Sequence, residues 1–80
     1  MADSPVPFTH EEHRELGLEL RQTETRLREL RDVVLAVYGE HNRASFSFQR
    51  VLESMTRLRA DLQIQMGRDY PGYGADGTYL

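Results

Sequence analysis

Cysteine is absent from the 80-residue chain, which excludes disulfide bonds and thiolate metal sites. Lysine is absent too, and all ten basic residues are Arg. No apolar run approaches the roughly 18 residues that a membrane-spanning helix needs. The N-terminus lacks the basic region and apolar core of a signal peptide. These absences predict a cytoplasmic protein that has no membrane partner.

Eighty residues allow one domain and only a modest core, because a short chain buries a small fraction of its surface. Without disulfides, the usual ways to stabilise such a chain are oligomerisation and regular helix packing. The length therefore favours a protein that assembles with copies of itself or with another protein.

Two rows of residues spaced alternately by three and four are the most informative pattern present. This alternation keeps side chains on one face of an α-helix and is typical of a coiled-coil seam. We expect both rows to form the interface within the hairpin or the oligomer. The first row holds His13, Leu16, Leu20, Thr23, Leu27, Leu30, Val34 and Val37, and the second holds Phe48, Val51, Met55, Leu58 and Leu62.

Clear signals mark both ends of the first helix, predicted over about residues 10–38. Thr9 and Glu12 form a capping box at its start, and Gly39 provides a positive-φ residue at its end. Proline is absent between Phe8 and Tyr70, so nothing in that stretch forces a break. Gly17 is the one weak position inside the helix, and it is a candidate for a close approach of another segment.

The second helix is predicted over about residues 46–66, with Ser45 as its cap and Gly67 after it. The short connection predicts an antiparallel hairpin. The predicted organisation is an extended arm at 1–8, a helical hairpin at 9–67 and a Gly/Tyr-rich tail at 68–80. The fold class is all-α: a two-helix hairpin with a coiled-coil-like seam, assembling into a four-helix bundle.

No motif requires a particular chemistry, and we expect neither an enzyme nor a cofactor. His10 and His13 share a helix face, but His41 belongs to the far end of the same helix, so no metal site is expected. The string from Gly72 to Gly77 matches a dinucleotide-binding pattern literally, yet it lacks the strand and helix that the mechanism needs.

The tail combines glycines, which disfavour regular structure, with apolar and aromatic residues of the kind enriched in interfaces. We expect it to be dispensable for folding and to dock on a partner or on a neighbouring subunit. The candidate docking residues are Tyr70, Tyr73, Tyr79 and Leu80.

The predicted function is a non-catalytic interaction or assembly module, with a second copy of the chain as the first partner. One alternative is a small structural subunit of a larger complex, such as a virion or a secretion apparatus. A second alternative is a regulatory nucleic-acid-binding protein that uses the Arg residues of the second helix. Net charge of −3 argues against nucleic acid as the main partner. The Arg residues concerned are Arg43, Arg50, Arg57 and Arg59.

Overall fold

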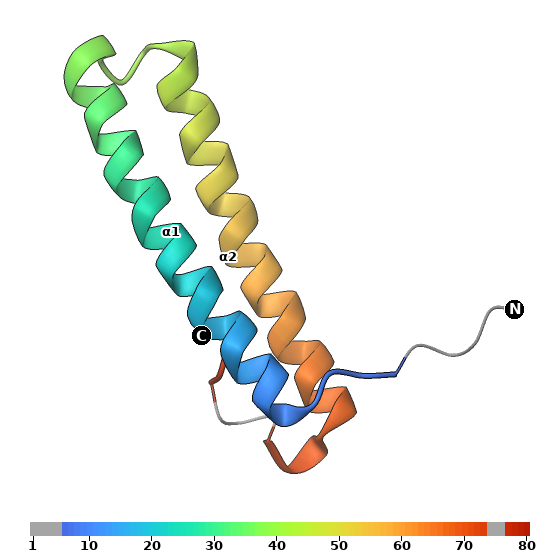
Figure 1. The fold of residues 1–80 in the computed structure, drawn as a ribbon. Helices are drawn as coiled ribbons and strands as arrows, with labels where there is room; N and C mark the ends of the chain where they lie inside the picture. The colour runs from blue at the N-terminus through green and yellow to red at the C-terminus, as the bar shows by residue number, and fades with distance from the viewer. Residues whose placement is uncertain (1–5, 74–76) are drawn as a thin grey trace, which may run out of the picture.

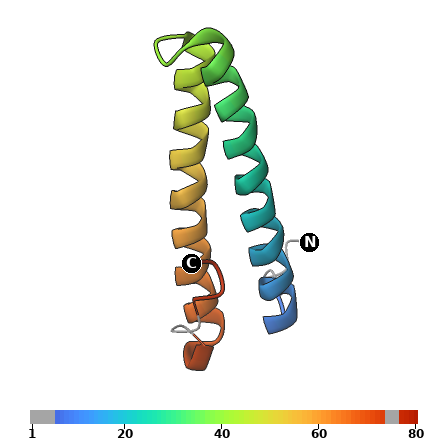
Figure 2. The same ribbon diagram turned by 90° about the vertical axis from the view of Figure 1, so that its left-hand side faces the viewer.

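The chain folds as two long antiparallel helices, followed by a C-terminal segment that returns along them (Figures 1 and 2). The computed structural model describes residues 6–73 and 77–80. Helix α1 spans His10–Tyr38, helix α2 spans Arg43–Asp69, and one turn of 3₁₀ helix, η1, spans Pro71–Tyr73. The prediction of an all-helical chain whose two helices pack against each other is confirmed.

Helix α1 begins and ends where its capping residues predict. The Glu12 amide donates to the Thr9 hydroxyl at 3.1 Å, and the Thr9 amide donates to the Glu12 carboxylate at 2.8 Å. Gly39 ends the helix with a φ of 84° and a ψ of 166°, a conformation that is essentially confined to glycine. The capping box and the positive φ at Gly39 are both confirmed.

Helix α2 begins three residues before its predicted start. Asn42 is the N-cap, and its side-chain oxygen accepts from the Ala44 amide at 2.8 Å. The prediction of Ser45 as the cap is wrong, because the Ser45 hydroxyl instead donates to the Gly39 carbonyl at 2.8 Å. Ser45 therefore ties the first turn of α2 back to the connection.

Helix α2 also continues past Gly67 to Asp69, so the predicted end at residue 66 is wrong. Its last turn is held by side chains that the sequence does not reveal as neighbours. Asp69 accepts from Gln65 at 2.9 Å and from His13 of α1 at 3.2 Å. These contacts outweigh the weak helix propensity of one glycine, which costs about 1 kcal/mol relative to Ala.

The line along which the helices meet is rotated from the predicted rows towards polar positions. Of the predicted rows, only His13 is fully buried. Several members are half-buried, namely Leu16, Leu20, Leu27, Val34, Phe48, Met55 and Leu62, and others are exposed, namely Thr23, Leu30, Val37, Val51 and Leu58. The positions buried deepest between the helices and the C-terminal segment are His13, Gly17, Glu24, Ser45, Leu52, Gln63 and Met66.

The apolar core of the single chain is small. Among the described residues, three large apolar side chains are buried, and twelve are exposed. The buried ones are Leu52, Met66 and Tyr79, and the last of these belongs to the C-terminal segment. The expectation of a tail outside the core is therefore wrong for Tyr79, which has no exposed surface and contacts both helices.

Candidate functional site

The C-terminal segment, residues 77–80, lies against side chains of both helices, and we call this place the tail slot. Its walls are His13, Gly17, Arg21 and Glu24 of α1 and Arg59 and Gln63 of α2. In both views of the fold, the C-terminal residues run back along the hairpin from its open end (Figures 1 and 2). This slot is the most elaborate polar arrangement in the described part of the chain.

Side chains of the hairpin hold the backbone of the segment at consecutive residues. Arg21 Nη1 donates to the Thr78 carbonyl at 2.9 Å. The Tyr79 amide donates to Gln63 Oε1 at 3.0 Å, and the Tyr79 carbonyl accepts from Arg59 Nη1 at 3.0 Å. Because all of these contacts use backbone groups of the segment, they depend little on its side chains.

Tyr79 is the residue of the segment whose side chain is fully buried in the slot. Its ring meets the His13 ring edge-on at 5.6 Å between centroids, and its hydroxyl lies 2.6 Å from His13 Nδ1. His13 Nε2 lies 3.2 Å from Asp69 Oδ2. An ionised carboxylate only accepts, so Nε2 carries the hydrogen, and in the neutral ring Nδ1 accepts from the Tyr79 hydroxyl.

His13 is the centre of an aromatic cluster at the open end of the hairpin. The rings of Phe8, Tyr70 and Tyr79 all approach it edge-on, with centroid distances of 5.4, 6.1 and 5.6 Å. The Tyr70 hydroxyl also donates to the Phe8 carbonyl at 2.6 Å, which ties the N-terminal arm to the end of α2. Burial, followed by the negative charge of Asp69, raises the pKa of Tyr79.

The order Asp69, His13, Tyr79 has the connectivity of a proton relay, but its terminal hydroxyl has no exposed surface. A catalytic hydroxyl needs room for a substrate atom about 3 Å away, and Tyr79 lacks that room while the segment is docked. The geometry therefore fits a structural hydrogen-bond chain that positions Tyr79.

A buried ion pair forms the other side of the slot. Arg59 Nε and Nη2 meet the two Glu24 carboxylate oxygens at 3.0 and 3.4 Å, and Arg28 Nη2 lies 2.6 Å from the same carboxylate. The Glu24 side chain is only 5% exposed. The pair of Glu24 with Arg28 is an i,i+4 helix pair, a kind that usually lies in solvent, but Arg59 of α2 joins it and Glu24 is buried. Arg59 is engaged by both Glu24 and the tail.

Gly17 allows the segment to approach α1 this closely. A Cβ atom at this position would lie 2.7 Å from the Thr78 carbonyl oxygen, well inside ordinary contact distance. The close approach that Gly17 suggested in the sequence is thus a contact with the tail.

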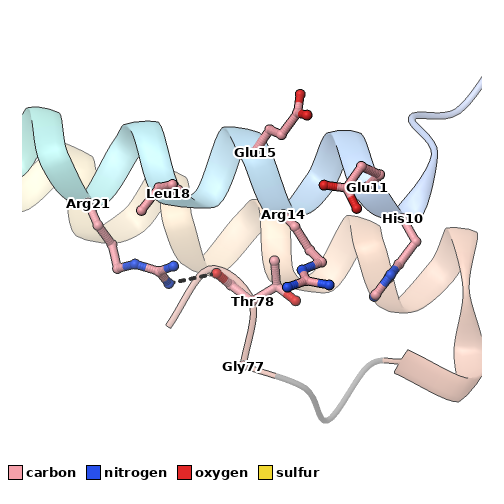
Figure 3. Close-up of a pocket in the computed structure, with 8 residues that line it drawn as sticks. All are labelled: His10, Glu11, Arg14, Glu15, Leu18, Arg21, Gly77 and Thr78. Atoms are coloured by element: carbon pink, nitrogen blue, oxygen red, sulfur yellow. Dashed lines mark hydrogen bonds between the residues drawn. The ribbon is translucent and has the colours of Figure 1, made fainter.

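A hollow borders the docked segment on the outer side of α1. In Figure 3, the Arg21 side chain reaches across this hollow to the Thr78 carbonyl. The hollow is lined by His10, Glu11, Arg14, Glu15, Leu18, Arg21, Gly77 and Thr78.

The other predicted docking residues lie in different surroundings. Tyr70 is half-buried in the cluster around His13, and Leu80 is 71% exposed. The side chain of Tyr73 is outside the described part of the structure. Two signals for the slot were visible in the sequence, Gly17 in the middle of a helix and Tyr79 in the tail. The sequence did not reveal the wall residues Arg21, Glu24, Arg59 and Gln63, nor Asp69, which holds His13.

A second candidate surface is the side of the hairpin that faces away from the tail slot, and we call it the apolar face. On α1 it precedes the slot residues by one position, since Leu16 and Leu20 come directly before Gly17 and Arg21. A shallow hollow there is lined by Leu27 of α1 and by Phe48 and Val51 of α2, among others. The apolar face consists of Leu16, Leu20, Leu27, Leu30, Val34, Phe48, Val51, Met55, Leu58 and Leu62.

In the described ranges, 6–73 and 77–80, no three His, Asp or Glu residues are grouped closely enough to hold a metal ion. Neither α1 nor α2 is apolar enough over a sufficient length to cross a membrane. Comparisons with protein-family models, with curated proteins and with solved structures found no match to this chain.

Proposed function

We propose that the chain is a non-catalytic assembly module, in which the apolar face binds the apolar face of a second copy. The product is a two-fold symmetric dimer in which two hairpins form a four-helix bundle. The observation that carries this proposal is that no side chain of the apolar face is buried in the single chain: Leu30, Val51 and Leu58 are exposed, and the other seven are half-buried. A hairpin with so small a core gains stability by covering that surface.

Half of the twelve exposed apolar side chains lie in the half of the hairpin next to the loop, namely Leu30, Val33, Val37, Tyr38, Phe46 and Val51. Leu30, Val37, Val51 and Leu58 of the predicted rows are 37%, 66%, 46% and 42% exposed. The tail lies at the opposite end, on the other side, so it covers none of them. In the proposed dimer the members of this set that belong to the apolar face, Leu30, Val51 and Leu58, fill the space between the two hairpins.

Charge supports a second copy as the partner. Helix α1 carries seven acidic residues and five Arg, whereas α2 carries three acidic residues and five Arg. A two-fold axis along the bundle places α1 of one copy beside α2 of the other, so helices of opposite net charge become neighbours. Complementary charge of this kind favours one arrangement over others more than it adds affinity.

Molecular mass in solution tests the proposal, with Val51→Asp as the disrupting variant and Gln49→Asp as the control. Gln49 lies two residues away, off the apolar face, and takes the same charge change. We expect the wild type and Gln49→Asp to have twice the chain mass of 9.3 kDa, and Val51→Asp to be shifted towards monomer. A carboxylate buried without a partner costs several kcal/mol, which is enough to dissociate a small dimer.

A wild type that is monomeric and fully helical at high micromolar concentration contradicts the homodimer. That result favours the alternative of a small subunit whose apolar face is covered by a different protein. The nucleic-acid alternative has less support, because Arg59 is committed to Glu24 and to the tail backbone. The nucleic-acid alternative predicts that the chain binds nucleic acid and that its affinity falls steeply as the salt concentration rises.

A further inference from the structure

We propose that the tail slot is a recognition site for an extended peptide segment that bears a tyrosine, and that residues 77–80 fill it as a tethered occupant. The partner is accordingly a protein that presents such a segment. This inference concerns the side of the hairpin opposite to the apolar face, and it holds whether or not the hairpin dimerises.

The contacts divide into a general part and a specific part, as they do in peptide-binding sites. Arg21, Gln63 and Arg59 bond to carbonyl and amide groups that every peptide has. Specificity comes from the place filled by the Tyr79 side chain, which is fully buried and ends on His13. The following residue, Leu80, is 71% exposed, so its side chain contributes little to the specificity of the site.

The hairpin itself holds two of the recognising side chains, Arg59 and His13, in position. Glu24 fixes the Arg59 guanidinium through two contacts, and Asp69 fixes the orientation of the His13 ring. Asp69 is in turn held by Gln65, which lies outside the slot. Side chains supported in this way keep their positions when an occupant leaves, which is the property of a preorganised binding site.

The polar character of the slot also allows an exchange of occupants. When the segment leaves, Arg21, Arg59, Gln63 and His13 expose groups that water can satisfy, so the emptied slot hydrates instead of collapsing. A short tether presents its own segment at an effective concentration on the order of millimolar. A partner segment therefore competes when it binds more tightly or is presented at a higher local concentration.

The test uses the full chain with Tyr79→Ala, which weakens the tethered occupant and leaves every wall residue intact. The probe is the tetrapeptide Gly-Thr-Tyr-Leu, blocked at both ends, and the readout is NMR of the Gln63 side-chain amide and the Arg21 and Arg59 Nε–H groups. We expect saturable shifts in this variant, and about tenfold weaker binding when the probe carries Phe in place of Tyr, since one buried hydrogen bond is lost. The wild type should need at least about tenfold more probe, because its own tail competes.

A matched control adds Gly17→Ala to Tyr79→Ala. The new methyl group occupies the path of the peptide carbonyl, so the probe should no longer bind. Gln22→Ala in the same background should leave binding unchanged, because Gln22 is exposed and lines a hollow that includes no tail residue. No saturable shift in a helical Tyr79→Ala chain, or equal binding by a probe with Ala in place of Tyr, overturns the proposal.

If Tyr79→Ala fails to fold, Tyr79→Phe replaces it, since it keeps the ring and removes only the hydroxyl that meets His13. The tyrosine probe should then displace the tail of Tyr79→Phe at a concentration about tenfold lower than it needs for the wild type. Equal resistance of both chains to the probe means that the segment is a permanent part of the fold, and the proposal fails.

Discussion

Replacing Gly17 by Ala is a perturbation whose sign depends on whether the tail is docked. In an isolated helix this change stabilises by about 1 kcal/mol, because Ala has a much higher helix propensity than Gly. In the folded chain the new Cβ atom would lie 2.7 Å from the Thr78 carbonyl oxygen. That oxygen accepts a bond from Arg21, so the tail has to move away from a position in which it is held.

The cost of that movement exceeds the gain in propensity. Displacing the segment uncovers Tyr79, and burying an aromatic side chain of this size contributes about 1.5–3 kcal/mol. Contacts of the segment with Arg21, Gln63 and Arg59 weaken as well. We expect a net loss of about 1 kcal/mol, which lowers the melting temperature by about 4–8 °C for a chain of this size.

Thermal unfolding followed by circular dichroism measures the effect, with all variants at one protein concentration because an oligomer melts at a concentration-dependent temperature. The same substitution in a Tyr79→Ala background completes a double-mutant cycle. With the tail already loosened, Gly17→Ala should raise the melting temperature. A rise of similar size in the wild-type background refutes the docked tail.

Two further predictions concern the connection and the alkaline limit of stability. Gly39→Ala should destabilise by about 1 kcal/mol, because φ is 84° and no neighbouring atom compensates, whereas Gly72→Ala, which also meets no neighbour and has no positive φ, should be nearly neutral in the same unfolding assay. Burial raises the pKa of Tyr79 above its ordinary value near 10, so the folded state holds this proton when the unfolded state has released it. The contribution of Tyr79 to stability is therefore complete below about pH 10 and declines as pH rises through the folded pKa. Melting curves between pH 8 and 11 should show a smaller alkaline loss for Tyr79→Phe than for wild type, because the phenylalanine side chain has no proton to release.

Helix α1 was predictable to the residue, because both of its ends are fixed by local chemistry. Thr9 with Glu12 at one end, and Gly39 at the other, act within one turn of the chain. The start of α2 was predicted three residues late, since Asn42 and Ser45 are both good caps. The choice between them depends on the geometry of the connection, where the Ser45 hydroxyl reaches the Gly39 carbonyl.

The periodicity of the apolar residues could not predict where the two helices meet or where the tail docks. A row spaced by three and four identifies an apolar face, but a neighbouring row about 100° away can be the one that meets the partner helix. Glu24 is buried because Arg59 and Arg28 neutralise it, and Arg59 lies 35 residues away along the chain. No local sequence pattern predicts an ion pair between residues so far apart, and none predicts that Tyr79 is buried in the core.

The contact between His13 and Tyr79 joins residues 66 positions apart, which has a consequence for the order of folding. The hairpin closes through a short turn between Gly39 and Asn42, so the contacts between the helices form first next to this turn and then extend away from it. The tail closes a loop of almost the whole chain, and its residues find their place only after both helices are aligned. Substitutions at the connection should therefore change the rate of folding, whereas substitutions in the tail slot should change mainly the rate of unfolding.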